Sequence, residues 1–256
     1  MLKQLFIFLT LGGSMASDET VHHSNTIILP PAVVEQADFN IDTLEVVNFS
    51  LSSHAREILK ELIKQPVVYN TDENEELQVH SQLYNPAPVL QFPLTDADRM
   101  DLLRLVAAFL STPNCAGLAA CQIGIHQPAL IYKIGDDVKD LRQDFTHSVP
   151  ITLLLNPQYK ALTDKKTTDW EGCFSVQTTM GEVDRFNHIK VTAYNSEGQP
   201  LEFEATGFEA RLIQHETDHT KGILFTHRLQ NHNRRGPYEE MRLLRMEDIQ
   251  RWKNAT

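Results

Sequence analysis

The sequence predicts an α+β fold with mixed, largely antiparallel sheets, a central helix and a further helix at the C-terminus. Apolar residues recur at helical spacing in four segments. Short apolar or alternating runs, bounded by turn residues, lie between these segments and are typical of strands. Neither an internal repeat nor a low-complexity tract is present. Helices mixed with antiparallel strands indicate the α+β class.

Two helices are predicted in the first half of the chain. The first follows Ser52-Ser53, and its apolar positions fall on one face: Ala55, Ile58, Leu59, Leu62 and Ile63. A polar, acidic loop is expected over 70–82. The second helix begins near Thr95-Asp96 and ends before Pro113, with an apolar stripe of Met100, Leu103, Val106, Phe109 and Leu110.

Strands and two more helices are predicted in the second half. Residues 129–132 and 151–155 are short apolar runs, and "HIKVTAY", "NSEG" and "LEFEAT" form a hairpin. A helix is expected from about Phe208 to His219. "PYEEMRLLRMEDIQRW" closes the chain as an amphipathic helix, with an apolar side of Tyr238, Met241, Leu244 and Trp252.

Composition excludes some classes of protein. The chain has 256 residues, 41% of them hydrophobic, which is enough for a sizeable core. A net charge of −11 argues against nucleic acid as a partner. No apolar run reaches the length of about 18 residues that a membrane span needs. Three cysteines are too few for a disulfide framework; the spacing of Cys115 and Cys121 permits a bond between them without requiring one.

The N-terminus has the order of features found in secretory signals. Lys3 is followed by an apolar run from Leu5 to Leu11 and by small residues at Ser14 and Ala16. We therefore predict a signal peptide over 1–16 and an exported protein if the signal is used; otherwise the protein is cytoplasmic. The alternative is a buried N-terminal strand or helix. Residues 17–82 are then an N-terminal extension that carries one helix.

The stretch "QHETDH", residues 214–219, contains a candidate metal site. His215 and His219 lie four apart, so on a helix both imidazoles can reach one divalent metal. Glu216 is placed to accept and donate a proton at a metal-bound water. Asp218 is expected to orient an imidazole. The alternative is a solvated helix face, but Leu212 and Ile213 indicate a buried helix.

A third ligand must come from another part of the chain. Cys173 in "WEGCFSV" is the favoured candidate, since a thiolate in a tight loop is a soft, strongly donating ligand. An ordinary buried thiol is the alternative reading. The next histidine, His227, does not have the spacing of the metzincin proteases.

Three segments together resemble peptide deformylase. The family pattern is Gly-x-Gly-Leu-Ala-Ala-x-Gln, then Glu-Gly-Cys-x-Ser, then Gln-His-Glu-x-Asp-His. The chain has "CAGLAACQ", "EGCFS" and "QHETDH" in that order, and the resemblance covers roughly residues 83–228. It implies a deformylase-like catalytic domain over 83–256, with its sheets packed around the helix that carries the histidines. It also implies removal of the formyl group from N-formylmethionyl peptides, with release of formate.

The resemblance also implies a role for individual residues. The metal would be Fe²⁺, with Zn²⁺ or Ni²⁺ possible. Glu216 would be the general acid and base, and Gln122 and the backbone N–H of Phe174 would stabilise the oxyanion. The other matched residues are the metal ligands Cys173, His215 and His219, and Gly117 and Leu118 beside the substrate peptide.

Further expectations concern the pocket, the departures from the family pattern and the rival functions. Phe208 and Leu212 are expected to line the methionine pocket; core packing is the alternative. Cys115 replaces the first glycine of the pattern and would narrow the peptide groove. Arg185 is expected to pair with Glu171.

The rival functions are a metal-dependent endopeptidase and a non-catalytic formyl-peptide binder.

Overall fold

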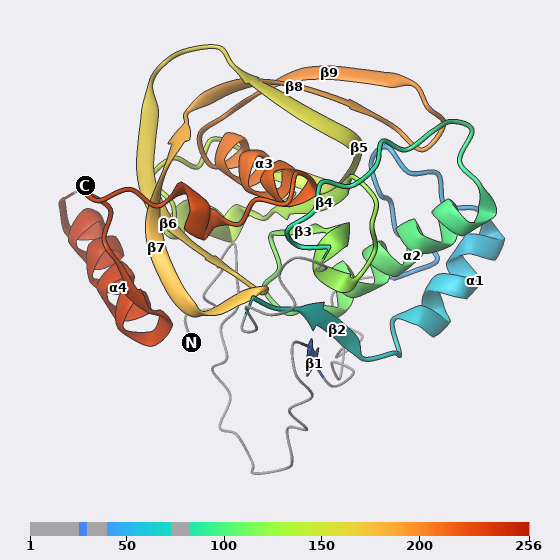
Figure 1. Cartoon of the computed structure of the whole chain (residues 1–256), viewed down its shortest axis with the longest axis horizontal. Helices are drawn as coiled ribbons and strands as arrows, with labels where there is room; N and C mark the ends of the chain where they lie inside the picture. Colours follow the sequence, from blue (N-terminus) through green and yellow to red (C-terminus); the bar gives the residue numbers. More distant parts are fainter. Residues whose placement is uncertain (1–25, 30–39, 73–81, 256) are drawn as a thin grey trace, which may run out of the picture.

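The computed structural model describes residues 26–29, 40–72 and 82–255, which form three antiparallel sheets (Figure 1). The largest has five strands in the order β3-β4-β5-β8-β9. These strands are β3 (Gly117–Ala119), β4 (Ala129–Ile134), β5 (Val149–Ala161), β8 (His188–Tyr194) and β9 (Pro200–Thr206). A three-stranded sheet has the order β10-β7-β6, with β6 (Lys166–Cys173), β7 (Val176–Phe186) and β10 (Arg235–Pro237). A two-stranded sheet pairs β1 (Thr26–Leu29) with β2 (Val67–Asn70).

The four α-helices of the described residues lie where the periodicity predicts them. They are α1 (Ser53–Leu62), α2 (Asp96–Ser111), α3 (Gly207–Thr220) and α4 (Tyr238–Ala255). Short 3-10 turns, η2 (Ala120–Ile123), η3 (Asp136–Asp140) and η4 (Phe225–Arg228), connect other elements. The α+β prediction and the predicted C-terminal helix are confirmed.

Helix α3 is the centre of the fold. It contacts all five strands of the largest sheet and also β7 of the three-stranded sheet. Figure 1 shows it enclosed by these strands, with α1 and α2 to one side and α4 to the other. All 14 residues of α3 are buried, polar ones included. Buried polar side chains require specific partners, so this helix is where specific chemistry is expected.

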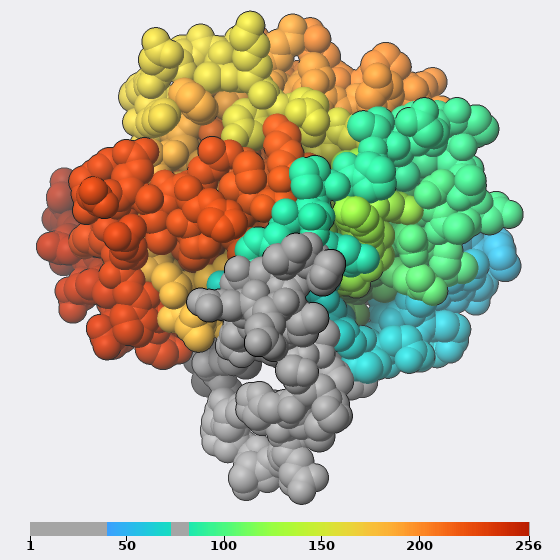
Figure 2. Space-filling model, viewed as in Figure 1, coloured from blue at the N-terminus to red at the C-terminus, as the bar shows by residue number. Residues whose placement is uncertain are grey.

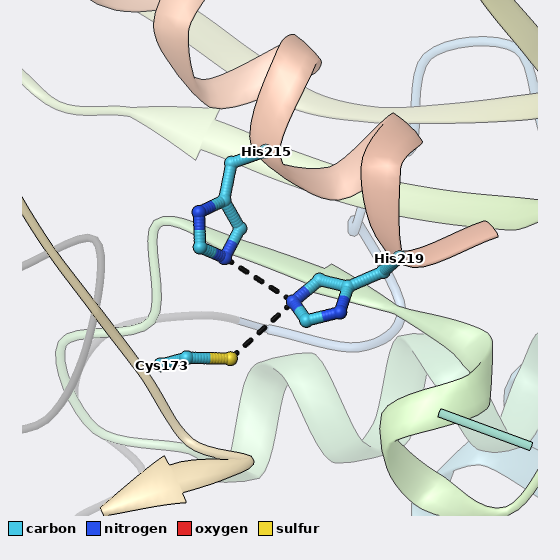
Figure 3. A group of neighbouring side chains, drawn as sticks. All are labelled: Cys173, His215 and His219. Atoms are coloured by element: carbon cyan, nitrogen blue, oxygen red, sulfur yellow. Dashed lines mark hydrogen bonds between the residues drawn. The ribbon is translucent and has the colours of Figure 1, made fainter. Parts of the chain in front are cut away.

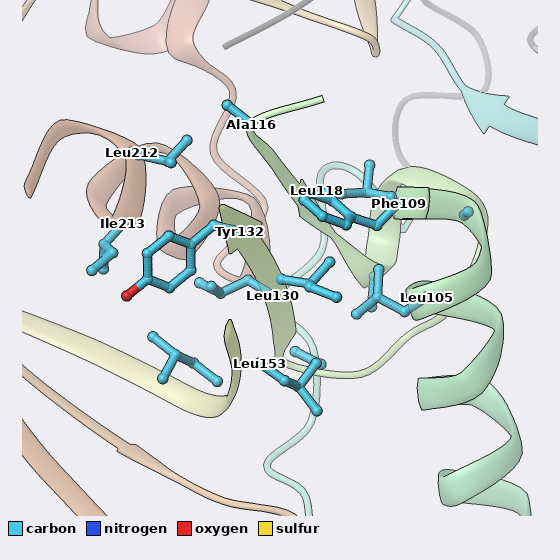
Figure 4. Close-up of a cluster of buried hydrophobic side chains, with 14 of the residues drawn as sticks. Leu105, Phe109, Ala116, Leu118, Leu130, Tyr132, Leu153, Leu212 and Ile213 are labelled. Atoms are coloured by element: carbon cyan, nitrogen blue, oxygen red, sulfur yellow. The ribbon is translucent and has the colours of Figure 1, made fainter. Parts of the chain in front are cut away.

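Helix α2 joins the sheet to the N-terminal part of the chain. Thr95 caps it: the Thr95 hydroxyl accepts from the Asp98 N–H at 3.1 Å, and Asp98 accepts from the Thr95 N–H at 2.9 Å. On the opposite side from α1, the helix packs on β3 and β4. Figure 4 shows the resulting core, which includes Leu105, Phe109, Leu118, Leu130, Leu153 and Ile213.

The described residues before position 82 pack against this core. Phe49, Leu59 and Tyr69 are buried in the same hydrophobic cluster as α2 and α3. Strands β1 and β2 were not predicted; each is only four residues long. The predicted signal peptide, residues 1–16, lies outside the described residues, as does most of the loop predicted over 70–82.

The long hairpin of β6 and β7 was also missed by the sequence reading. Lys166–Cys173 begins with exposed and half-buried polar residues and ends with four buried ones, so it has no regular alternation. Its backbone pairs with β7 from Lys166↔Phe186 to Cys173↔Val176. This pairing, and not a local hydrophobic pattern, defines the strand.

Segments distant in the sequence meet at the C-terminal end of α3. The Ala87 N–H donates to the Thr220 carbonyl at 3.0 Å, and a Cβ on Gly222 would lie 2.5 Å from the Tyr84 carbonyl carbon. In Figure 2, the blue-green segment after residue 82 lies against the orange-red surface of this region. None of the helices in the described residues is long and apolar enough to cross a membrane.

Candidate metal centre

Three side chains bring their metal-binding atoms together in the interior (Figure 3). His219 Nε2 lies 3.2 Å from His215 Nε2 and 3.3 Å from Cys173 Sγ. The three ligand atoms all lie within 4.8 Å of one another, and all three residues are buried. The structure therefore brings together the three residues that the sequence singles out as ligands.

The local fold explains this convergence. His215 and His219 are four apart on α3, so their rings lie on one face of the helix. Cys173 is the last residue of β6, and only Phe174 and Ser175 separate it from β7. The pairing of Cys173 with Val176 closes this tight turn and directs the sulfur toward α3.

The donor set fits a divalent transition metal. In a tetrahedral site with metal–nitrogen bonds of about 2.0–2.1 Å, two nitrogens lie about 3.3 Å apart. The two imidazole nitrogens are 3.2 Å apart here. Two imidazoles and one sulfur also suit zinc or iron better than the hard cations calcium and magnesium, which prefer oxygen ligands.

A buried carboxylate fixes the orientation of one imidazole. His215 Nδ1 lies 2.9 Å from Glu171 Oε2, so Nδ1 carries the proton and Nε2 offers its lone pair to the site. Arg185 donates to both oxygens of Glu171, at 3.0 and 2.9 Å, and Arg211 donates to Oε1 at 2.9 Å. The predicted pair of Arg185 and Glu171 is present, and it is buried rather than exposed.

Charge and burial set the protonation of this carboxylate and imidazole. Burial alone raises the pKa of Glu171, but the Arg185 guanidinium and the His215 hydrogen bond outweigh it and hold that pKa well below the usual range. Burial lowers the pKa of His215 in spite of its Glu171 partner. An ionised Glu171 beside a neutral His215 is the combination that a metal-binding histidine needs.

The expectation that Asp218 orients an imidazole is wrong. Its carboxylate accepts from Arg185 at 2.5 Å and from Arg228 at 3.0 and 2.8 Å, and the Tyr159 hydroxyl lies 3.3 Å away. Asp218 is thus linked to His215 through hydrogen bonds of Arg185 and Glu171 rather than by one of its own. Position on the helix decides this, because Asp218 faces Tyr159 of β5 and Arg185 of β7 rather than the three candidate ligands.

Glu216 follows the candidate ligand His215 on α3, and its carboxylate is fully buried. Neither of its oxygens has a hydrogen-bond partner among the described residues. A Cβ added to Gly117 would lie 2.6 Å from Glu216 Oε1, so the backbone of β3 passes directly beside it. Burial, followed by the negative charge of Glu171, raises the pKa of Glu216 well above its usual value. This carboxyl group can hold a proton that an exposed glutamate would lose.

An amide side chain completes the polar part of the site. Gln122 Oε1 accepts from the Ala119 N–H at 2.8 Å, which leaves Nε2 pointing to Cys173 Sγ at 3.4 Å and Ser175 Oγ at 3.5 Å. Phe174 follows Cys173 in the hairpin turn, and its ring stacks on Tyr69 with 5.1 Å between ring centroids. Gln122 and Phe174 therefore both lie next to Cys173, the candidate sulfur ligand.

The four residues predicted to bind substrate have different surroundings. A Cβ on Gly117 would lie 2.8 Å from Leu212 Cδ1, so Leu212 packs against the strand beside Glu216. Leu118 is fully buried in the core. The Arg142 guanidinium lies 4.7 Å from the centre of the Phe208 ring. Of the predicted pair, Leu212 is thus the one in contact with the strand that borders Glu216.

All three cysteines are free thiols. Cys115 is partly exposed and donates to the Gly117 carbonyl at 3.1 Å. Cys121 is buried and donates to the His219 carbonyl at 3.4 Å. The pair that the sequence spacing permits is not formed.

Comparisons with known proteins agree on one family. The sequence profile for polypeptide deformylase matches residues 66–235. Peptide deformylase 2 of Rickettsia conorii is 41% identical over 141 residues, which are 54% of this chain and 70% of that relative. Peptide deformylase 1 of Bacillus subtilis is 35% identical over 158 residues, 60% of this chain and 91% of that relative. A crystal structure of class I type b peptide deformylase from Acinetobacter baumannii matches with a TM-score of 0.51 and 26% identity, covering 58% of this chain and 93% of that chain.

Proposed function

Because the chain belongs to the peptide deformylase family, we propose that Cys173, His215 and His219 hold one divalent metal and that Glu216 transfers the proton. The enzyme removes the N-formyl group from peptides, releasing formate and a free amino group. The observation that supports the proposed roles is the convergence of one sulfur and two imidazole nitrogens next to a buried carboxyl group without a hydrogen-bond partner among the described residues.

The metal would be held by neutral imidazoles and the Cys173 thiolate. When bound, a divalent cation lowers the pKa of a coordinated water and polarises the formyl carbonyl. Glu171 keeps His215 in the tautomer that binds metal, and Arg185 and Arg211 keep Glu171 ionised. We infer Fe²⁺ as the metal, with Zn²⁺ or Ni²⁺ able to replace it, since all three accept sulfur and nitrogen ligands.

Glu216 would transfer the proton from the attacking water to the leaving amino group. Its buried oxygens lie beside the β3 backbone, where no other described group donates to them. The carboxylate takes a proton from the attacking water and passes it to the amide nitrogen as the C–N bond breaks. Its raised pKa favours the protonated state that this second step needs.

Two donors would stabilise the charge that develops on the formyl oxygen. The Ala119 N–H holds Gln122 by its carbonyl oxygen, so the amide group cannot flip and Nε2 stays directed at the site. The backbone N–H of Phe174 is the proposed second donor, in the turn that also positions Cys173. Loss of one such donor typically lowers the rate by about 10²–10³.

Strand β3 would bind the backbone of the peptide. It lies at one end of the five-stranded sheet and pairs only with β4 among the described strands. The Lys133 N–H donates to the Ala116 carbonyl at 2.8 Å, so the backbone N–H and C=O groups of Ala116 and Leu118 point toward β4. Polar groups alternate along a strand, so the N–H and C=O of Gly117 face away from β4. An extended peptide can pair with this edge and bring its formyl end to Glu216. Leu212 would line the pocket for the first side chain, and Phe208 would support it from the core.

A formate-release assay with formyl-Met-Ala-Ser tests this function, with metal content measured on the same sample. We expect formate in proportion to bound metal, and loss of release in Glu216→Ala at unchanged metal content. Formate release that survives Glu216→Ala would contradict the proposed proton transfer. Two other outcomes would support the rivals: cleavage of an unblocked internal peptide bond indicates an endopeptidase, and binding of the formyl peptide without release of formate indicates a binder.

Export is a separate proposal that rests on the sequence of residues 1–16. An exported enzyme would meet free formylated peptides, and zinc would be favoured over oxidation-prone Fe²⁺. N-terminal sequencing of the protein from the secreted fraction tests cleavage after Ala16. Metal analysis of the same material tests the second part, and iron as the dominant metal would reject it.

A further inference from the structure

Cys115 lies two residues before Gly117, at the start of β3, where the open edge of this strand passes Glu216. Its thiol donates to the Gly117 carbonyl at 3.1 Å. This carbonyl faces away from β4, because the preceding Ala116 carbonyl accepts from Lys133. The Cys115 side chain therefore satisfies the acceptor that a pairing peptide strand would use.

The same position borders the reacting groups. A Cβ on Gly117 would lie 2.6 Å from Glu216 Oε1 and 2.8 Å from Leu212 Cδ1, so the Gly117 backbone touches both the proposed proton carrier and the proposed pocket. Glu216 is fully buried, and neither of its oxygens has a hydrogen-bond partner among the described residues. Cys115 is partly exposed, which distinguishes it from the buried Cys121 and Cys173.

We propose that the Cys115 thiol caps the edge of β3 and must be displaced when peptide backbone binds there, so that Cys115 sets the KM for the peptide. The inference rests on the proposed function, since it assumes that peptide pairs with β3. It concerns binding and leaves the proton transfer unaffected, because the thiol bonds to Gly117 and not to Glu216. Cys115 stands where the family pattern has glycine, which has no side chain to displace.

Three variants of Cys115 separate loss of the cap from other effects. Cys115→Ala and Cys115→Gly remove the donor, and we expect KM for formyl-Met-Ala-Ser to fall about 2–5-fold with kcat nearly unchanged. Cys115→Ser keeps a hydroxyl donor at the same place and should leave KM at or above the wild-type value. Cys115→Ala removes the thiol without the extra backbone freedom that Cys115→Gly adds, so agreement between the two variants assigns the effect to the thiol. Unchanged KM in both Ala and Gly variants, or a change confined to kcat, would overturn the proposal.

Chemical modification gives an independent test on the holoenzyme. Methyl methanethiosulfonate transfers its CH₃S group to the Cys115 thiolate: the new S–S bond forms, the reagent's S–S bond breaks, and methanesulfinate leaves. The added CH₃S group is larger than the thiol and obstructs the edge of β3, so KM should rise in spite of the lost donor and return to its initial value after treatment with a phosphine reductant. Cys115→Ala should show no reversible change, and an equal effect in that variant would contradict the role of Cys115.

A binding measurement separates failure of this inference from failure of the proposed function. In a Glu216→Ala background, calorimetry gives the affinity for formyl-Met-Ala-Ser without turnover. Tighter binding on addition of Cys115→Ala supports the cap even if the wild-type enzyme releases no formate. Equal affinity rejects the cap even if formate release is normal.

Discussion

Glu171 Oε2 lies 2.9 Å from His215 Nδ1, so a carboxylate on β6 holds in place an imidazole on α3. Both side chains are buried, and Arg185 and Arg211 neutralise the carboxylate. The strand that ends in one proposed ligand thus also orients another. The two halves of the candidate site depend on each other through this contact.

Replacing Glu171 by glutamine should weaken the metal site. Glutamine cannot supply two ionised oxygens, so His215 loses its charged partner. Among the described carboxylates, Arg185 then keeps only Asp218, and Arg211 keeps only the more distant Asp144. We expect metal affinity to fall about 10–100-fold and stability to fall by about 3–5 kcal/mol. Chelator competition and thermal unfolding measure the two effects. Glu204→Gln, in an exposed pair with His188, is the matched control; equal metal affinity in both variants would contradict the role of Glu171.

Replacing Glu216 by glutamine should have opposite effects on activity and stability. The variant cannot transfer a proton, so kcat should fall by about 10²–10⁴. It also replaces a carboxyl group whose ionised form is disfavoured by burial with an amide that carries no charge, so the metal-free protein should gain about 1 kcal/mol at neutral pH. Formate release and thermal unfolding check both parts. Exposed Glu240→Gln is the control, and a Glu216→Gln variant less stable than this control would count against the second part.

Adding one methyl group at Gly117 should damage catalysis without removing the metal. A Cβ there would lie 2.6 Å from Glu216 Oε1 and 2.8 Å from Leu212 Cδ1, so both side chains must shift. Such overpacking costs about 1–3 kcal/mol, and we expect kcat/KM to fall about tenfold or more. Gly135→Ala is a useful control, because there the close neighbour is the terminal oxygen of the exposed Asp137 side chain. Normal kcat/KM in Gly117→Ala would show that β3 lies farther from the reaction than we propose.

Asp144 should make stability depend on pH. Burial raises the pKa of its carboxyl group despite Arg142 and Arg211 nearby, and neither oxygen has a hydrogen-bond partner among the described residues. A raised folded-state pKa means that the folded form binds the proton more tightly than the unfolded chain. The contribution to stability is therefore full below about pH 3.8 and is lost as pH rises through the folded value.

Asp144→Asn, which does not titrate, tests this sign. The variant should become more stable than the wild type as pH rises above about 4, by about 1 kcal/mol at neutral pH. Denaturant unfolding from pH 3 to 7 measures the difference. In the control Asp164→Asn, at an exposed position, the difference in unfolding free energy from the wild type should change little with pH. A wild type that becomes more stable relative to Asp144→Asn as pH rises would contradict the predicted sign.

The sequence predicted the helices and the grouping of Cys173, His215 and His219, but not the contacts between distant strands. Helical periodicity located α1 to α4, and the spacing of His215 and His219 placed two rings on one face. Asp218 was misassigned because adjacency along α3 does not say which neighbour each side of the helix meets. Glu171 is 44 residues from His215, and only the docking of β6 against α3 brings the two together. Strand β6 begins with exposed polar residues, so it lacks the alternation of apolar residues that predicts a strand.

The sulfur of Cys173 comes from a hairpin tip, and its nearest imidazole partner is 46 residues further along the chain. The proposed cation would close a loop of that size between them, as a covalent cross-link would. Closing such a loop restricts the unfolded chain by about 4 kcal/mol on the entropic account of cross-links. The ion that takes part in the reaction would then also stabilise the fold. Removing the metal would abolish activity and also remove one of the links that hold the β6–β7 hairpin against α3.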